Sequence, residues 1–174
     1  GAASDATGKV KIGIVGSGRI GATLGGLWLK AGHEVMFSSL DLNHDKALAA
    51  SLGPGARAGT PREAAAFGEV LLMAVPYSAL PQLGRDLADL IKGKVVLDAC
   101  NPIPGRDGEI ATWAREKGAG LASAELLPGR DSVGRAFRRG NHRNVDQTTP
   151  ILASSVNSTN AATPNPVLTS VTVT

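Results

Sequence analysis

The sequence has few of the residues that build disulfides, metal clusters and membrane spans. Cys100 is the only cysteine among 174 residues, so the chain can form no internal disulfide and no site built from several cysteine ligands. No apolar run approaches the roughly 18–20 residues that a membrane-spanning helix needs, so we expect no membrane partner. Aromatic residues make up only 3% of the chain, whereas 22 residues are glycine. This profile favours an α/β fold with many tight turns.

Charge of either sign is also limited. The formal net charge of +3 comes without a basic stripe, so we expect no nucleic-acid partner, although a phosphorylated ligand fits the small excess of Lys and Arg. His33, His44 and His142 are scattered along the chain, and neither a Ser–His–Asp arrangement nor metal-ligand spacing appears. We therefore assign no catalytic side chain and no metal ligand.

Apolar runs alternate with helical patterns along most of the chain. The expected strands cover residues 10–15, 34–38, 56–58, 70–75, 94–100 and 132–137. The expected helices cover residues 19–31, 45–52, 78–91 and 109–117, with another starting at the "TPRE" capping box of residues 60–63. This βαβα alternation predicts a single-domain Rossmann-like α/β fold, with a doubly wound parallel sheet in strand order 3-2-1-4-5-6.

A glycine-rich turn joins the first expected strand to the first expected helix. Its sequence, G-S-G-R-I-G, is the G-x-G-x-x-G element of dinucleotide-binding folds: Gly16, Ser17, Gly18, Arg19, Ile20 and Gly21. In this element the first glycine permits the tight turn, the second lets the backbone approach a pyrophosphate, and the third lets the helix pack closely on the sheet. The helix N-terminus would then hold the pyrophosphate.

The end of the second strand lacks the acidic residue that usually selects NAD. Ser38 and Ser39 stand there instead, 22 and 23 residues after Gly16, and they leave room for a 2′-phosphate that a carboxylate would repel. The sequence therefore favours NADP. Leu40 occupies a position where a phosphate-binding Arg would be natural, and His44 and Lys46 either supply the positive charge or are simply solvated.

Two further strand ends belong to the same predicted crevice. "AVPYSALP" follows the fourth apolar strand and "DACNPI" closes the fifth, at the carboxyl edge where parallel sheets bind ligands. We interpret Cys100 as a small buried hydrophobic residue and not as a nucleophile.

The two ends of the chain differ from its middle. Residues 147–174 contain no charge and no glycine, and they predict a loosely attached tail in which "TSVTVT" could still form an edge strand. We divide the chain into a leader (1–9), an NADP-binding Rossmann domain (10–140) and a low-complexity tail (141–174). The small-residue leader is an expression scar or the remnant of a cleaved signal, so the expected location is cytoplasmic, with export as the alternative.

Residues 9–137 resemble the NADPH-dependent reductases of the deazaflavin coenzyme F-420. The resemblance lies in "KIGIVGSGRIGATLGGLWLKAGHEVMFSS", "GTPREAAAFGEVLLMAVPYSALP", "GKVVLDACNPI" and "LLPG…GRAF". Pyrroline-5-carboxylate reductases and the cytosolic domains of metalloreductases share the N-terminal module. The resemblance implies hydride transfer between NADP(H) and the deazaflavin, without an acid or base from the protein.

The resemblance also implies roles for individual residues. Residues 17–20 would contact the pyrophosphate, and Ser38 and Ser39 the 2′-phosphate. The nicotinamide side would be lined by Val75, Pro76, Asn101 and Ala136. From Arg138 onward the resemblance ends, and with it the family's segment that completes the deazaflavin site and a homodimer. The end of the chain is therefore either out of frame, giving a truncated reductase, or a divergent tail. A nucleotide-binding module without turnover and a reductase of a small imine or ferric chelate remain the alternatives.

Overall fold

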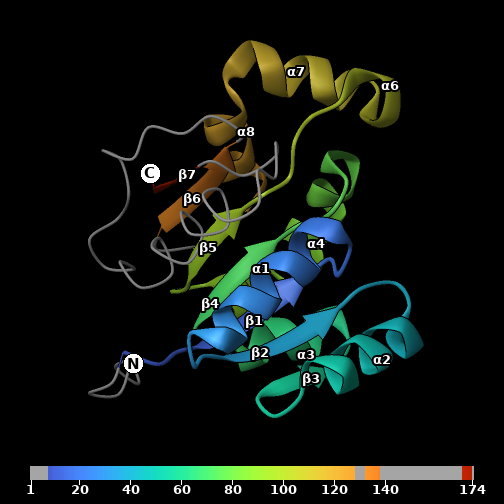
Figure 1. Cartoon of the computed structure of the whole chain (residues 1–174). Helices are drawn as coiled ribbons and strands as arrows, with labels where there is room; N and C mark the ends of the chain where they lie inside the picture. Colours follow the sequence, from blue (N-terminus) through green and yellow to red (C-terminus); the bar gives the residue numbers. More distant parts are fainter. Residues whose placement is uncertain (1–7, 128–131, 138–169, 174) are drawn as a thin grey trace.

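The strands form one twisted sheet in the order that the sequence predicts. The computed structural model describes residues 8–127, 132–137 and 170–173. Its sheet runs β3-β2-β1-β4-β5-β6-β7, in which the first six strands are parallel and β7 is antiparallel to β6 (Figure 1). The strands are β1 (Lys11–Val15), β2 (Glu34–Ser38), β3 (Ala56–Ala58), β4 (Val70–Met73), β5 (Val95–Asp98), β6 (Ser132–Phe137) and β7 (Ser170–Val173). The predicted Rossmann-like fold and strand order are confirmed.

Helices cover both faces of this sheet, and alternate residues of each strand face the two layers. Ile12 and Ile14 of β1 pack with Leu24 and Trp28 of the first helix on one face. Val15 packs on the other face, with residues from the third, fourth, seventh and eighth helices. The helices that cover the sheet are α1 (Arg19–Lys30), α2 (Leu42–Leu52), α3 (Pro61–Phe67), α4 (Leu80–Asp86), α5 (Ala88–Ile91), α7 (Glu109–Lys117) and α8 (Ala119–Leu126). The central strands β1, β4 and β5 are buried on both faces along nearly their whole length, as their nearly continuous apolar sequence requires.

The boundaries of several elements differ from those that the sequence predicts. α2 begins at Leu42 and not at residue 45, because the side chain of Asp41 caps it by accepting a hydrogen bond from the His44 amide at 3.0 Å. The single helix predicted over residues 78–91 is divided into the 3-10 turn η1 (Tyr77–Ala79), α4 and α5. The short α6 (Pro104–Asp107) and α8 were not predicted from the sequence pattern. The capping box at Thr60 and Glu63 is present as predicted.

The edge of the sheet beyond β6 is formed by the last strand. β7 pairs antiparallel with β6, with Ala136 opposite Val171, which agrees with the edge-strand alternative for "TSVTVT". The described residues leave out 1–7 of the predicted leader and 138–169, a range that ends the predicted domain and contains most of the predicted tail. The division into leader, domain and tail therefore stays a prediction.

His33 is a buried structural residue directly before β2, at the opposite end of that strand from the carboxyl edge of the sheet. Its ring is buried, and Nδ1 accepts a hydrogen bond from the Val10 amide at 3.1 Å. Burial lowers the pKa of His33, and the nearby charge of Lys9 lowers it further.

Within residues 8–127, 132–137 and 170–173, no helix has the length and apolar character needed to cross a bilayer.

Candidate functional site

The glycine-rich loop lies between β1 and α1, where the winding of the sheet reverses direction. β1 pairs with β2 on one side and with β4 on the other, so the loop opens at the switch point of the sheet (Figure 1). Gly16 has φ of +106°, and a Cβ built on it would lie 2.1 Å from the carbonyl oxygen of Ala74. A Cβ on Gly21 would lie 1.9 Å from the carbonyl oxygen of Gly16. Only glycine therefore fits the turn and the close packing of α1.

The second glycine of the loop faces open space. Gly18 is the N-cap of α1, and among the described residues no atom lies within 4 Å of a Cβ built on it. No side chain caps the helix, and its first turn holds no acidic residue. Arg19 is exposed and Ile20 is half-buried at this end of α1. The uncapped amides and the positive end of the helix dipole fit a pyrophosphate that approaches over Gly18.

The two serines at the end of β2 have different surroundings. Ser38 is fully buried, and its hydroxyl donates to the carbonyl oxygen of Ile14 at 2.7 Å. Ser38 therefore ties β2 to β1, and its hydroxyl hydrogen is not directed at a ligand. Ser39 is half-buried at the rim of the loop. Of the predicted serine pair, Ser39 is the one that lies near a possible ligand.

A buried carboxylate, which sequence reasoning did not single out, connects the glycine-rich loop with the end of β2. Asp45, in the first turn of α2, has no exposed surface. Its Oδ1 accepts a short hydrogen bond from the hydroxyl of Ser17, and its Oδ2 accepts one from Ser39 at 2.7 Å. The early start of α2, signalled by the capping Asp41, brings Asp45 into this position.

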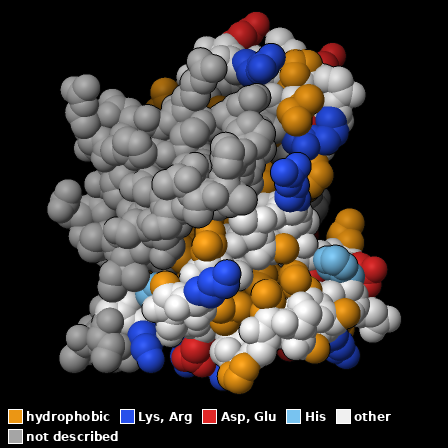
Figure 2. All heavy atoms as spheres, in the orientation of Figure 1, with side chains coloured by type: hydrophobic (Ala, Val, Ile, Leu, Met, Phe, Trp, Pro, Cys, Tyr) orange, Lys and Arg blue, Asp and Glu red, His pale blue; other side chains and the backbone are white. Residues whose placement is uncertain are grey.

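The β2–α2 loop carries exposed side chains next to the same site. Leu40 is fully exposed, and His44 is exposed with its Nε2 3.4 Å from the carbonyl oxygen of Ser17. Figure 2 shows a histidine beside hydrophobic and acidic side chains at the edge where this loop lies in Figure 1. Lys46 is exposed on the following turn. Lys46 therefore offers a positive charge beside the loop, although no Arg follows the serines.

The ends of β4 and β5 form the other side of the switch point. Val75 is half-buried and Pro76 exposed after β4, and Asn101 is half-buried after β5. The thiol of Cys100 joins the two ends, because Sγ lies 3.4 Å from the Val75 amide and 3.3 Å from the Met73 carbonyl oxygen. Cys100 is buried, as its interpretation as a small core residue requires.

The structure does not describe the surroundings of every predicted nicotinamide contact. Ala136 lies on β6, two strands beyond β4 in the sheet, and only its backbone pairing with β7 is described. The other predicted site residues all follow the carboxyl ends of neighbouring parallel strands: the glycine-rich loop, Ser39, Val75, Pro76 and Asn101. The Ser38 hydroxyl, in contrast, faces the sheet.

A second buried carboxylate fixes the loops above β4 and β5. Asp107 accepts hydrogen bonds from the amides of Ser78 at 3.1 Å and Ile103 at 2.9 Å, and it pairs with Arg106 at 2.9 Å. Burial raises the pKa of Asp107, but the Arg106 guanidinium and the two amides outweigh burial and lower this pKa to about 2. Arg106 also donates to the carbonyl oxygen of Asn101 at 2.8 Å. Asp107 and Arg106 thus hold the loop that carries Asn101.

Asp107→Asn is expected to lower the free energy of unfolding by about 2 kcal/mol at neutral pH, because each pKa unit corresponds to about 1.36 kcal/mol. The folded pKa of Asp107 lies below its ordinary value of 3.8. Its stabilising effect is therefore full well above the unfolded pKa and is lost as the pH falls through the folded pKa. In urea unfolding, the difference between the wild type and the variant should shrink between about pH 5 and pH 2.

The matched control is Asp89→Asn, which removes an acid whose side chain is 63% exposed in its pair with Arg62. We expect a much smaller effect, because exposed ion pairs contribute little. A loss of stability in Asp107→Asn that is independent of pH would contradict the role given to the buried carboxylate.

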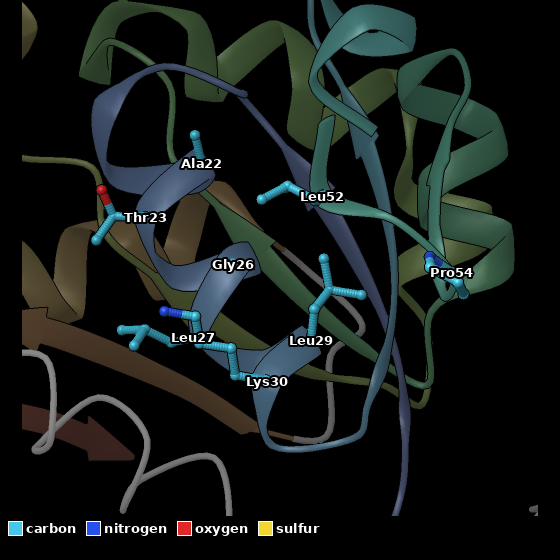
Figure 3. Close-up of a pocket in the computed structure, with 8 residues that line it drawn as sticks. All are labelled: Ala22, Thr23, Gly26, Leu27, Leu29, Lys30, Leu52 and Pro54. Carbon is cyan, nitrogen blue, oxygen red and sulfur yellow. The ribbon is translucent and has the colours of Figure 1, made fainter. Parts of the chain in front are cut away.

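A separate hollow lies on the outer face of α1. It has a volume of about 400 Å³ and runs from Ala22 to Lys30, opposite Leu52 and Pro54 (Figure 3). Figure 2 shows hydrophobic side chains gathered over α1 and α2 in this region. The hollow is open and mostly apolar, and it faces away from the carboxyl edge of the sheet. Its position therefore does not match a dinucleotide bound over the glycine-rich loop.

Among the described residues, no three His, Cys, Asp or Glu side chains gather as metal ligands.

Comparison with known proteins agrees with this arrangement. Residues 11–102 match the family described as "NADP oxidoreductase coenzyme F420-dependent", which is more than half of the chain. The match begins at β1 and ends just after Asn101, so it contains the glycine-rich loop, the serine pair and the ends of β4 and β5. No curated protein matches the sequence.

Solved structures share the fold at low sequence identity. A proposed F-420-dependent NADP reductase of Arthrobacter sp. FB24 is 19% identical with a TM-score of 0.54, over 73% of this chain and 62% of that one. An imine reductase of Myxococcus stipitatus, solved with NADP+, is 19% identical with a TM-score of 0.51, over 90% of this chain and 52% of that one. A hypothetical protein of Sinorhizobium meliloti is 18% identical with a TM-score of 0.56, over 92% of this chain and 82% of that one. At this identity the likeness shows the fold alone, and the chain spans 62% and 52% of the length of the two reductases.

Proposed function

The chain belongs to the family of coenzyme F-420-dependent NADP oxidoreductases, and on that premise we propose that it binds NADP(H) and transfers hydride between it and a deazaflavin of the coenzyme F-420 type. The observation that carries the proposal is the open, uncapped N-terminus of α1 beneath Gly18, at the switch point of the sheet. A pyrophosphate needs such free amides, and a close backbone approach needs a residue without a side chain.

Each part of the dinucleotide has a corresponding strand end. The amides of residues 17–20 would hold the pyrophosphate, and Ser39 would contact the 2′-phosphate beyond β2. Val75, Pro76 and Asn101 would lie beside the nicotinamide, beyond β4 and β5. Ala136 remains a proposed contact on β6.

The protein's contribution to the reaction would be orientation and exclusion of water. Bound NADPH supplies the hydride. Direct transfer requires that two rings be held face to face, and it needs no acid or base at the reacting carbon. The half-buried Val75 offers an apolar side chain at the strand ends, and the buried Cys100 thiol holds its backbone by accepting a hydrogen bond from the Val75 amide. The loop that Asp107 fixes would keep Asn101 in place at the same site.

The proposal is tested by mixing the full chain with NADPH and each of three acceptors: the deazaflavin, a free flavin and a small cyclic imine. NADPH oxidation that requires the deazaflavin supports the proposed acceptor. Oxidation with the imine alone would move the chain to the second candidate, which is favoured by the likeness to imine reductases. Tight NADPH binding without oxidation by any acceptor would indicate a nucleotide-binding module without turnover.

Leu40→Arg is expected to raise the affinity for NADPH about tenfold, or about 1.4 kcal/mol, while leaving that for NADH nearly unchanged. Leu40 is fully exposed directly after Ser39, and a guanidinium there can form a bidentate, charge-assisted contact with a phosphate. Leu52→Arg, on the outer end of α2, is the control for an added charge elsewhere. Calorimetric titration measures both affinities. Equal gains for the two cofactors, or no gain, would place the 2′-phosphate away from residue 40.

A further inference from the structure

We propose that Asp45 is a specificity-determining residue: its carboxylate limits the preference of the site for NADPH over NADH by holding the hydrogen of Ser39. The inference rests on the proposed binding of NADP(H). No acidic residue stands at the end of β2, but α2 brings one to the same place from the other side.

The hydrogen bonds of Ser39 leave no hydrogen for a phosphate. A serine hydroxyl has a single hydrogen to donate. Ser39 Oγ lies 2.7 Å from Asp45 Oδ2 and 3.2 Å from the carbonyl oxygen of Asp41, so the carboxylate is the closer acceptor. The amide of Asp41 donates to the same Oγ at 3.0 Å. A 2′-phosphate could therefore accept this hydrogen only if Ser39 no longer donated it to Asp45.

The carboxylate also opposes a phosphate by its charge. A phosphate oxygen that accepts from Ser39 would lie no more than about 5 Å from Asp45 Oδ2, because two O···O contacts of about 2.7 Å each would share Ser39 Oγ. Like charges at this distance repel, and Asp45 is fully buried, so water and salt screen the repulsion poorly. The uncharged 2′-hydroxyl of NADH meets no such repulsion. Lys46 is exposed on the same helix, so water and salt screen its opposing attraction for the phosphate.

Asp45 remains in this position because it also supports the glycine-rich loop. Ser17 is buried, and its hydroxyl donates to Asp45 Oδ1. An asparagine could keep this bond through its amide oxygen, and its NH₂ group could donate to Ser39. Ser39 would then be free to donate its own hydrogen to a phosphate. Asp45→Asn therefore separates the specificity role from the support of the loop.

The test is calorimetric titration of the full-length wild type and Asp45→Asn with NADPH and with NADH, together with the melting temperature of each protein. We expect Asp45→Asn to bind NADPH about tenfold more tightly than the wild type does, with less than a twofold change for NADH. The matched control is Asp41→Asn, which removes an equal but exposed charge from the same loop and keeps a good helix cap. We expect less than a twofold change in its affinity ratio.

Three outcomes would overturn the inference. They are an unchanged ratio in Asp45→Asn, an equal loss of both affinities, and an equal change of the ratio in Asp41→Asn. Should Asp45→Asn not fold, Ser39→Ala gives the answer, because a hydroxyl already held by Asp45 contributes less than twofold to NADPH binding. A tenfold, NADPH-specific loss in Ser39→Ala would contradict the inference. If the wild type binds neither cofactor, the proposed function itself fails.

Discussion

Gly18→Val is expected to weaken NADPH binding at least a hundredfold, or about 2.8 kcal/mol, while the domain keeps its fold. The side chain would project into the open space above the N-terminus of α1, where we place the pyrophosphate. Gly18 has φ of −70°, which any residue can adopt, and no described atom lies within 4 Å of the added Cβ. The valine therefore causes no clash within the protein, but it would clash with the bound pyrophosphate.

Calorimetry of the variant measures the affinity, and thermal unfolding checks the fold. Gly26→Ala is the control, since it adds a methyl group to the outer face of the same helix, 3.8 Å from Leu52. We expect that control to bind NADPH as the wild type does. Undiminished binding in Gly18→Val would mean that the dinucleotide does not cross the loop at Gly18.

Gly16→Ala is expected to have the largest effect on stability, lowering the free energy of unfolding by about 3–5 kcal/mol. Gly16 has a positive φ, and the new methyl group would lie 2.1 Å from the carbonyl oxygen of Ala74. Ala74 directly follows β4, and its own amide donates a hydrogen bond to the carbonyl oxygen of Val15, at the end of β1, at 2.8 Å. Relief of the clash would require β1 and β4 to separate at the switch point.

Gly53→Ala is the matched control for Gly16→Ala. Gly53 also has a positive φ of +88°, but a Cβ there has open space within 4 Å. Its substitution should show the backbone strain alone, about 1–3 kcal/mol. Urea unfolding of both variants separates the two contributions. Equal losses would show that β4 can move away and that the turn is less tightly packed than the distance indicates.

The strands and their order follow directly from the sequence. Each buried parallel strand reads as a short apolar run, and the glycine-rich turn after β1 fixes the point at which the chain enters α1. The roles of Gly16 and Gly21 could be predicted because close packing of a helix on a strand admits no Cβ. Local pattern and tertiary packing agree at these positions.

The hydrogen-bond partners of the site could not be read from the sequence in the same way. Ser38 and Ser39 are neighbours with the same side chain, yet the alternation of β2 turns one hydroxyl to Ile14 and the other to Asp45. The carboxylate of Asp45 reaches the loop only because α2 starts at Leu42, three residues before the predicted start. Helix starts are the least certain part of a sequence pattern, because a cap decides them.

Asp107 was missed for a related reason. The "NPIPGRDG" stretch reads as a turn. Nothing in it indicates that its acid accepts a hydrogen bond from the amide of Ser78, which lies 29 residues earlier in the chain. Long-range contacts of this kind depend on how β4 and β5 lie together. The sequence could therefore predict which strand ends form the site, but not which buried acids hold them.

The central claim is that NADP(H) binds across the carboxyl edge of the sheet over the glycine-rich loop. An NMR titration of the ¹⁵N-labelled chain with NADP+ tests it most directly, because each backbone amide reports on its own surroundings. We predict saturable shifts for the amides of Gly16 to Gly21, Ser39 and Val75, with little change around Leu52 and Pro54. Shifts confined to the hollow on the outer face of α1, or no saturable shifts at all, would contradict the account.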